Sequence, residues 1–224
     1  MAMAAAATLA GTPRSISANY NVSLNGLPVA VINEHFESQD NAYRIISESN
    51  TVGVAALFRK QSATLVSSGR LLKTGLRPER FEGHNRGKDS RQAVAVFDWP
   101  TQRLTLSYDD KTETAALAPG TQDRISLMYQ FMFFDFGKLK QLDVTMTNGR
   151  KLEQYRYAVI PDAEIDTPLG RIKSLHLVKQ RESDEAATEI WLSPRHHFFP
   201  VKVLIVEADG SRYEQVLTRL DLKP

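Results

Sequence analysis

The chain has 224 residues, of which 42% are hydrophobic and 24% charged, and its formal net charge is +2. This composition supports a packed core in one large all-β domain or two small domains, and it excludes a chain that is disordered as a whole. The small net charge, with basic residues interleaved among acidic ones, argues against nucleic acid as a partner. The chain contains no cysteine, which excludes disulfides, thiol nucleophiles, cysteine-ligated zinc and iron–sulfur clusters. No run approaches the roughly 20 apolar residues of a membrane span.

The first 16 residues are predicted to lie outside the fold. Met1–Gly11 is rich in alanine and resembles the end of a secretory signal, although the basic and fully apolar parts of such a signal are missing. One interpretation is an export signal that is incomplete in this chain; the other is a disordered cytoplasmic tail. The absence of cysteine is compatible with export to an oxidising bacterial periplasm.

The N-terminal half reads as a series of short strands. Asn19–Leu24 and Val29–Phe36 flank Asn25-Gly26, a strong signal for a tight hairpin. Pro28 begins the second of these strands and, because it lacks an N–H, predicts an edge position. Val52–Phe58 is predicted as either a short helix or a bent strand. Further strands are expected at Ala42–Ser49, Ala63–Leu72, Arg77–His84, Gln92–Trp99, Gln102–Tyr108 and Thr114–Leu117.

After Pro119-Gly120 the apolar period changes from two to that of a helix. One face of a helix over residues 121–136 would carry Ile125, Met128, Tyr129, Met132, Phe133 and Phe136. Thr121 is a plausible N-cap and Gly137 a natural residue just past the end. Because Leu127, Phe131 and Phe134 fall off that face, the helix should be buried on two sides or cover something.

Beyond the helix the strand pattern returns. Leu142–Thr147 and Leu152–Ile160 flank a second hairpin signal, Asn148-Gly149. The remaining expected strands are Ile172–Lys179, Glu189–Ser193, Val201–Glu207 and Tyr213–Leu222, separated by turns at Asp166–Gly170, Ser193-Pro194 and Asp209-Gly210. The sequence therefore predicts a mainly β fold: a single antiparallel curved sheet over residues 17–224, forming a barrel or half-barrel with one main helix packed on its concave side.

Several segments carry a family resemblance when taken in order: Val52–Phe58 with Arg59-Lys60, Phe97–Trp99, Pro119–Leu127, Asp166–Gly170, Trp191–Pro194 and Phe199–Lys202. Together they resemble the bacterial envelope family catalogued as domain of unknown function 3108. The resemblance covers roughly residues 18–222 and implies an exported, usually periplasmic protein of barrel or half-barrel type, with no established catalytic residues. The shape is also similar to the half-barrels that carry lipoproteins in the bacterial envelope, which is an analogy of fold alone.

Two interpretations of the helix remain open. In the first it covers an apolar cavity lined by Met128, Phe131, Met132, Phe133 and Phe134, which suits a lipid because Met and Phe adapt to irregular apolar ligands. In the second the helix fills the barrel and supplies its core. Cations at the mouth of such a cavity would meet an anionic head group, and the candidates are Arg59, Lys60 and Arg124.

Catalytic and metal chemistry find little support. His196-His197 is a poor chelate, because adjacent residues of a strand point to opposite faces, and the other histidines are scattered. No Gly-x-Ser-x-Gly elbow or nucleotide-binding loop is present. The acids near Asp109 and Glu182 fall in predicted turns. Trp99 and Trp191 are expected to be cross-strand packing residues. The sequence thus predicts a protein that is not an enzyme and holds no metal or cofactor.

Phe198-Phe199 is the candidate partner site. If exposed, the two rings would form an apolar patch for a partner or a membrane surface; if buried, they would staple the last strands. The first functional hypothesis is a periplasmic carrier or chaperone that binds a lipid or acyl chain between the sheet and the helix. The alternative is an envelope interaction or scaffold protein with a filled core and no small ligand.

Overall fold

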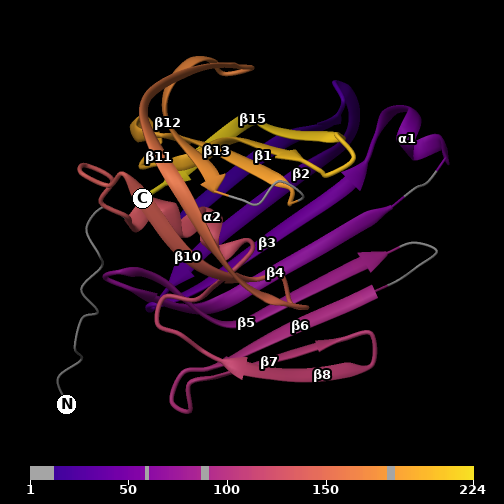
Figure 1. Ribbon diagram of the computed structural model, residues 1–224. Helices are drawn as coiled ribbons and strands as arrows, with labels where there is room; N and C mark the ends of the chain where they lie inside the picture. The colour runs from indigo at the N-terminus through magenta and orange to yellow at the C-terminus, as the bar shows by residue number, and fades with distance from the viewer. Residues whose placement is uncertain (1–12, 59–60, 87–90, 181–184) are drawn as a thin grey trace.

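The protein is described by a computed structural model that covers residues 13–58, 61–86, 91–180 and 185–224 (Figure 1). Within those ranges fifteen strands join one sheet. There are also two short helices, α1 (Gly53–Phe58) and α2 (Ser126–Gln130), and two 3-10 turns, η1 (Phe131–Phe133) and η2 (Pro194–His196). The strands are β1 (Ser15–Leu24), β2 (Leu27–Gln39), β3 (Ala42–Thr51), β4 (Ser62–Leu72), β5 (Gly75–Arg86), β6 (Arg91–Asp98), β7 (Arg103–Tyr108), β8 (Lys111–Ala116), β9 (Gln122–Asp123), β10 (Gln141–Thr147), β11 (Leu152–Thr167), β12 (Gly170–Gln180), β13 (Ala187–Ser193), β14 (Phe199–Val206) and β15 (Arg212–Lys223).

The sheet consists of two meanders that share a central seam. Its order is β8-β7-β6-β5-β4-β3-β2-β1-β15-β14-β13-β12-β11-β10-β9, so β1 and β15 lie side by side in the middle. Pairing is antiparallel except between β9 and β10. At the seam the Arg14 amide N–H donates to the Lys223 carbonyl at 2.8 Å. Tight hairpins set the local order, and the first has the predicted geometry: Asn25 and Gly26 both have positive φ, 51° and 82°.

The sheet curls so that its two halves meet through side chains. In Figure 1, β10 and β11 cross in front of β3 to β5. The tip of the β10–β11 hairpin reaches β5 and β6: a Cβ added to Gly149 would lie 3.0 Å from Ala93 Cβ and 3.1 Å from the ring of Phe81. Beside it, the Arg150 guanidinium donates to both carboxylate oxygens of Asp109, at 2.5 and 3.1 Å. The predicted curved sheet of barrel or half-barrel type is confirmed, and these contacts join its two halves.

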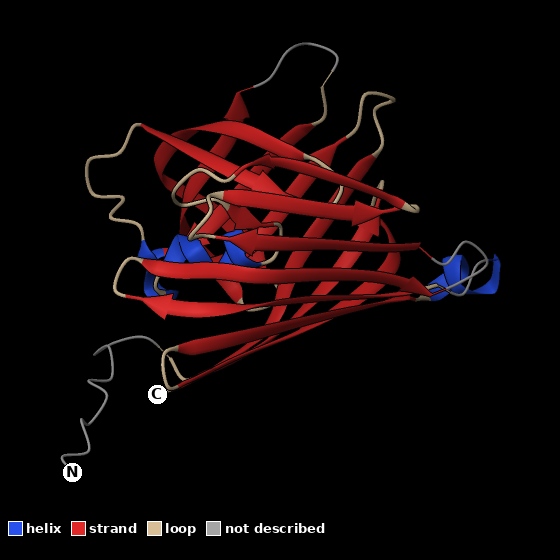
Figure 2. Ribbon diagram, turned by 90° about the horizontal axis from the view of Figure 1, so that it is seen from below, coloured by secondary structure: helices blue, strands red, loops and turns tan. Residues whose placement is uncertain are grey.

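Helix α2 lies inside one end of the curve and α1 lies at the other end (Figure 2). The Tyr129 ring stacks on Phe36 and meets Phe199 edge-on, each with 5.4 Å between ring centroids. On the other side of the helix, Leu127 and Phe131 belong to a second apolar cluster. The expectation that this segment is buried on two sides is confirmed, because its residues belong to two separate parts of the core.

The helix is shorter than the predicted 121–136. Gln122 and Asp123 pair with β10, so the helix begins at Ser126, and Asp123 rather than Thr121 accepts the first free amides. After η1 the chain turns extended at Phe134 (φ −83°, ψ 139°), and the Asp135 carboxylate accepts the Gly137 N–H at 3.0 Å. A strand pairing at one end and an Asp-centred turn at the other therefore override the helical period.

Two other expectations need correction. Pro28 does not mark an edge: β2 lies between β1 and β3, and Pro28 sits at a register shift, beyond the last β3 pair at Ala30. A proline is tolerated there because no ladder partner needs its N–H. The fold also begins earlier than residue 17, because Ser15 opens β1 and Ile16 is only 1% exposed. Residues 1–12 of the expected tail lie outside the described part of the chain.

The open alternative at residues 52–58 resolves as helix α1. Strand β11 continues seven residues past the predicted end at Ile160, because a register shift between Ile160 and Ala163 takes up Pro161. Among the helices that the structure describes, none is long and apolar enough to cross a membrane.

Candidate ligand cavity between sheet and helix

A cavity of about 410 Å³ lies where the α2 segment meets one end of the sheet. Its walls come from the β4–β5 hairpin, the β6–β7 turn, the chain just after β8, and the segment that carries β9 and α2. The volume is in the range of small-molecule sites. The lining residues are Leu72, Thr74, Leu76, Arg77, Trp99, Gln102, Leu117, Pro119, Gly120, Gln122, Gln130 and Phe134.

Most of the side chains that form the wall are apolar. Trp99 presents its indole to the cavity while its Nε1–H donates to the Pro78 carbonyl at 2.6 Å, and Phe97 stacks on it at 6.1 Å. Leu72 also lines the cavity but is 36% exposed, so it lies at the rim, where the cavity meets the solvent. An apolar wall with a partly open rim is the arrangement that accepts the chain of an amphipathic molecule.

Two glutamines hold the helical segment against the start of β5. The Gln130 side chain donates to the Thr74 carbonyl at 2.9 Å and accepts the Leu76 N–H at 2.7 Å. The Gln122 Nε2 donates to the Leu76 carbonyl at 2.9 Å. Gly75, with φ +112°, lies against the Gln130 amide, and a Cβ there would collide with it. These bonds fix the walls of the cavity.

Two polar atoms at this cavity have no partner. Across the described residues, the buried side-chain atoms that lack a hydrogen bond are Arg77 Nε and Gln122 Oε1, and both residues line the cavity. Gln122 is only 3% exposed. An unpaired buried donor or acceptor costs about 1–3 kcal/mol, so each needs a structural or functional reason.

A buried acid lies on the other side of α2. Glu34 accepts hydrogen bonds from Ser47 Oγ at 3.1 Å and Tyr129 Oη at 3.2 Å. Burial raises the pKa of its carboxyl, while these two donors and the charge of Arg124 oppose the rise. Arg124 is exposed to solvent, yet desolvation by the surrounding protein lowers the pKa of its guanidinium.

Asp123 ties α2 to the sheet. Its Oδ1 accepts the amides of Ile125 at 3.1 Å and Ser126 at 2.9 Å, and its Oδ2 accepts the Ser67 hydroxyl at 2.5 Å. Ser67 in turn bonds Tyr43 at 3.0 Å. Burial raises the pKa of Asp123 to about 6, although these hydrogen bonds oppose the rise. The network anchors the helix and is enclosed by protein.

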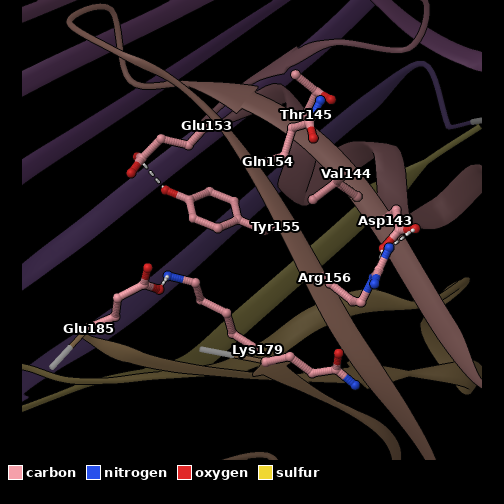
Figure 3. A pocket seen from close by; sticks show the side chains of 10 residues that line it. Asp143, Val144, Thr145, Glu153, Gln154, Tyr155, Arg156, Lys179 and Glu185 are labelled. Atoms are coloured by element: carbon pink, nitrogen blue, oxygen red, sulfur yellow. Dashed lines mark hydrogen bonds and ion pairs between the residues drawn. The ribbon is translucent and has the colours of Figure 1, made fainter. Parts of the chain in front are cut away.

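A larger groove, about 730 Å³, straddles β11 and is polar (Figure 3). Its charges already neutralise one another: Lys179 Nζ lies 3.0 Å from Glu185 Oε2, and Arg156 Nε lies 2.7 Å from Asp143 Oδ1. The Tyr155 hydroxyl donates to Glu153 at 2.5 Å. A ligand there would have to break these pairs, so we regard the smaller apolar cavity as the better candidate.

A model of the family described as "Protein of unknown function (DUF3108)" matches residues 19–218. The chain belongs to the DUF3108 family. The resemblance drawn from the sequence is therefore confirmed. No curated protein matches the chain.

One solved structure places the DUF3108 chain among barrel-like folds. The crystal structure of a β-barrel-like protein of domain of unknown function DUF1849 from Brucella abortus matches with a TM-score of 0.62 at 10% identity, over 95% of this chain and 99% of that one. A putative exported protein with a YmcC-like fold from Bacteroides fragilis matches with a TM-score of 0.36 at 10% identity, over 94% and 96% of the two chains. The likeness to the Brucella abortus protein shows the fold alone.

The predicted ligand-binding residues of this DUF3108 chain that the structure describes divide among four places. Phe134 lines the cavity. Phe131 is completely buried in the second cluster, while Met128, Met132 and Phe133 are partly buried against the larger one. Arg124 stands exposed near Glu34 and Asp123. Arg59 and Lys60 lie outside the described residues.

The predicted partner site is mostly internal. Phe199 is 0% exposed, and Phe198 packs on Phe136 with 4.8 Å between ring centroids. The two rings therefore pack inside the protein beside the last strands, as in the second alternative given above, and do not form an exposed patch. Nearby, His196 bonds Ser193 Oγ at 2.9 Å. No three His, Asp or Glu side chains of the described ranges gather as a metal site.

Sequence reasoning missed Arg77, Gln122 and Gln130 as cavity residues. Gln122 was assigned to the first turn of a helix, and Arg77 to the start of an ordinary strand. The roles of Gln122 and Gln130 depend on contacts across 46 to 56 residues of sequence, between the α2 segment and the β4–β5 hairpin. Neither residue carries a local signal that could have revealed these contacts.

Proposed function

We propose that the protein is a non-catalytic carrier or chaperone of the bacterial periplasm, which binds a lipid or acyl chain between the curved sheet and the α2 segment. The observation that carries this proposal is the 410 Å³ cavity with Trp99, Leu117 and Phe134 in its wall. Each methylene that leaves water contributes about 0.8 kcal/mol. A chain that buries about eight methylenes gains about 6 kcal/mol on this scale. A micromolar Kd requires a binding free energy of about 8 kcal/mol, so burial of the chain would supply most of it.

The absence of cysteine and the alanine-rich N-terminus support the periplasmic part of the proposal. Osmotic shock of a bacterium that expresses the protein from its natural gene should release it with the periplasmic fraction. Retention with the cytoplasmic fraction would overturn the proposed location.

Purification from a bacterial envelope, followed by native mass spectrometry, tests the carrier function. We expect a discrete added mass that an organic solvent extracts as lipid. Leu72→Trp should fill the rim of the cavity and reduce the lipid-bound fraction several-fold, because the indole occupies the space of the chain. Leu169→Trp is the matched control, since Leu169 is also an exposed hairpin leucine, 44% exposed, and lies in the β11–β12 turn.

A bare protein mass in repeated preparations would overturn the carrier function. The scaffold alternative would then stand, with the α2 segment as the filling of the core. Equal lipid loss in Leu72→Trp and Leu169→Trp would place the ligand somewhere other than this cavity.

A further inference from the structure

We infer that Arg77 and Gln122 form a head-group subsite in the wall of the cavity, which selects a long-chain acid bearing a hydroxyl or amide N–H close to its carboxylate. The inference rests on the proposed carrier function and specifies its ligand. Its starting point is that the unpartnered Arg77 Nε is a donor, the unpartnered Gln122 Oε1 is an acceptor, and both residues line one cavity.

The Arg77 and Gln122 side chains come from adjoining parts of the cavity wall. Gln122 Nε2 donates to the carbonyl of Leu76, the residue that precedes Arg77. This bond orients the Gln122 amide and leaves its oxygen as the free acceptor. Arg77 has no carboxylate partner among the residues that the structure describes. Its positive charge is therefore available to an external anion.

The chemistry of the subsite follows from these two groups. An arginine N–H forms its strongest hydrogen bond with an anionic oxygen, whereas an amide oxygen accepts from a hydroxyl or an N–H. The ligand that bonds both most strongly carries an anionic oxygen for Arg77 and a donor for Gln122 within a few bonds of each other. The apolar wall formed by Leu76, Trp99 and Leu117 receives its chain. A neutral alcohol could reach both atoms with its single hydroxyl, but it would lack the charge that strengthens the hydrogen bond to Arg77.

Calorimetric titration of the whole protein with three ligands of equal chain length tests the inference: dodecanol, dodecanoate and 3-hydroxydodecanoate. We expect dodecanoate to bind about tenfold more tightly than dodecanol, because it gains a charge-assisted hydrogen bond to Arg77. The 3-hydroxy acid should bind about fivefold more tightly again, because its hydroxyl donates to Gln122 Oε1.

Arg77→Met should abolish the preference for the acid and leave the affinity for dodecanol within about twofold, because the apolar stem of the side chain is kept. Arg77→Lys should restore part of the preference. Arg80→Met is the matched control on the same strand, since Arg80 is exposed, pairs with Glu82 and does not line the cavity. Thermal unfolding of each variant verifies that it is folded.

The two proposals fail in different ways. If none of the three ligands binds the wild-type protein, the carrier function falls and the inference falls with it. If acid and alcohol bind equally, or if Arg77→Met keeps the preference for the acid, the carrier function stands and the head-group subsite is overturned. Ordered water would then satisfy the two orphan atoms.

Discussion

Replacing Asp123 with alanine is expected to lower the free energy of unfolding by about 3 kcal/mol. The substitution removes the acceptor of the Ile125 and Ser126 amides and of the Ser67 hydroxyl, all of which are buried. Each unpaired group costs about 1–3 kcal/mol, and part of that cost is offset because the buried carboxylate itself is gone. Urea unfolding at pH 7, followed by tryptophan fluorescence, measures the change.

Asp123→Asn is the matched control. The asparagine oxygen can still accept both helix amides and buries no charge, so we expect this variant to be at least as stable as the wild type at pH 7. A loss as large in Asp123→Asn as in Asp123→Ala would contradict the capping role and would assign the effect to the charge instead.

The stabilities of the wild type and of Asp123→Asn should depend differently on pH. Burial raises the pKa of Asp123 from its ordinary value of 3.8 to about 6. The folded state therefore keeps a proton that the unfolded chain has already released. This stabilisation is complete below pH 3.8 and is lost as the pH rises through about 6. We expect the wild type to lose about 3 kcal/mol of stability relative to Asp123→Asn over that window. Parallel curves for the two proteins would contradict the raised pKa.

The sequence predicted the parts of the fold that local signals control. Asn25-Gly26 produces its hairpin because both residues accept positive φ, and alternating apolar residues place Tyr20 and Ile45 in the core. The seam between β1 and β15 has no local signal, because it joins residues about 200 positions apart. The start of the predicted helix is wrong for the same reason, because the pairing of Gln122 with Met146 of β10 competes with the helix.

The candidate site was less predictable than the fold. The apolar period of residues 125–136 correctly marked a segment with Phe134 in the wall of a cavity. It could not distinguish Phe134 from Phe131, which is completely buried, because the chain leaves the helical path between them. The polar side of the cavity comes from Arg77, Gln122 and Gln130, whose proximity depends on the curvature of the whole sheet.

Gly149→Ala is expected to destabilise the protein by about 3 kcal/mol, because backbone strain and close packing both oppose the added methyl group. The substitution tests the contact between the β10–β11 hairpin tip and the strands β5 and β6. Gly149 has φ +88°, which already strains an alanine by about 1–2 kcal/mol. Its added Cβ would also press against Ala93 and Phe81, at 3.0 and 3.1 Å. The hairpin tip would have to retreat from β5 and β6, or those side chains would have to move within a packed core.

Gly210→Ala separates the two effects. Gly210 has nearly the same φ, +84°, but a Cβ there would meet nothing within 4 Å. We expect it to cost about 1 kcal/mol, which is the backbone strain alone. Urea unfolding of both variants gives the difference. If that difference is about 2 kcal/mol, the hairpin tip holds the barrel-like shape by close packing. If the two variants are equally destabilised, the tip lies loosely on β5 and β6, and the curvature comes from the twist of the strands alone.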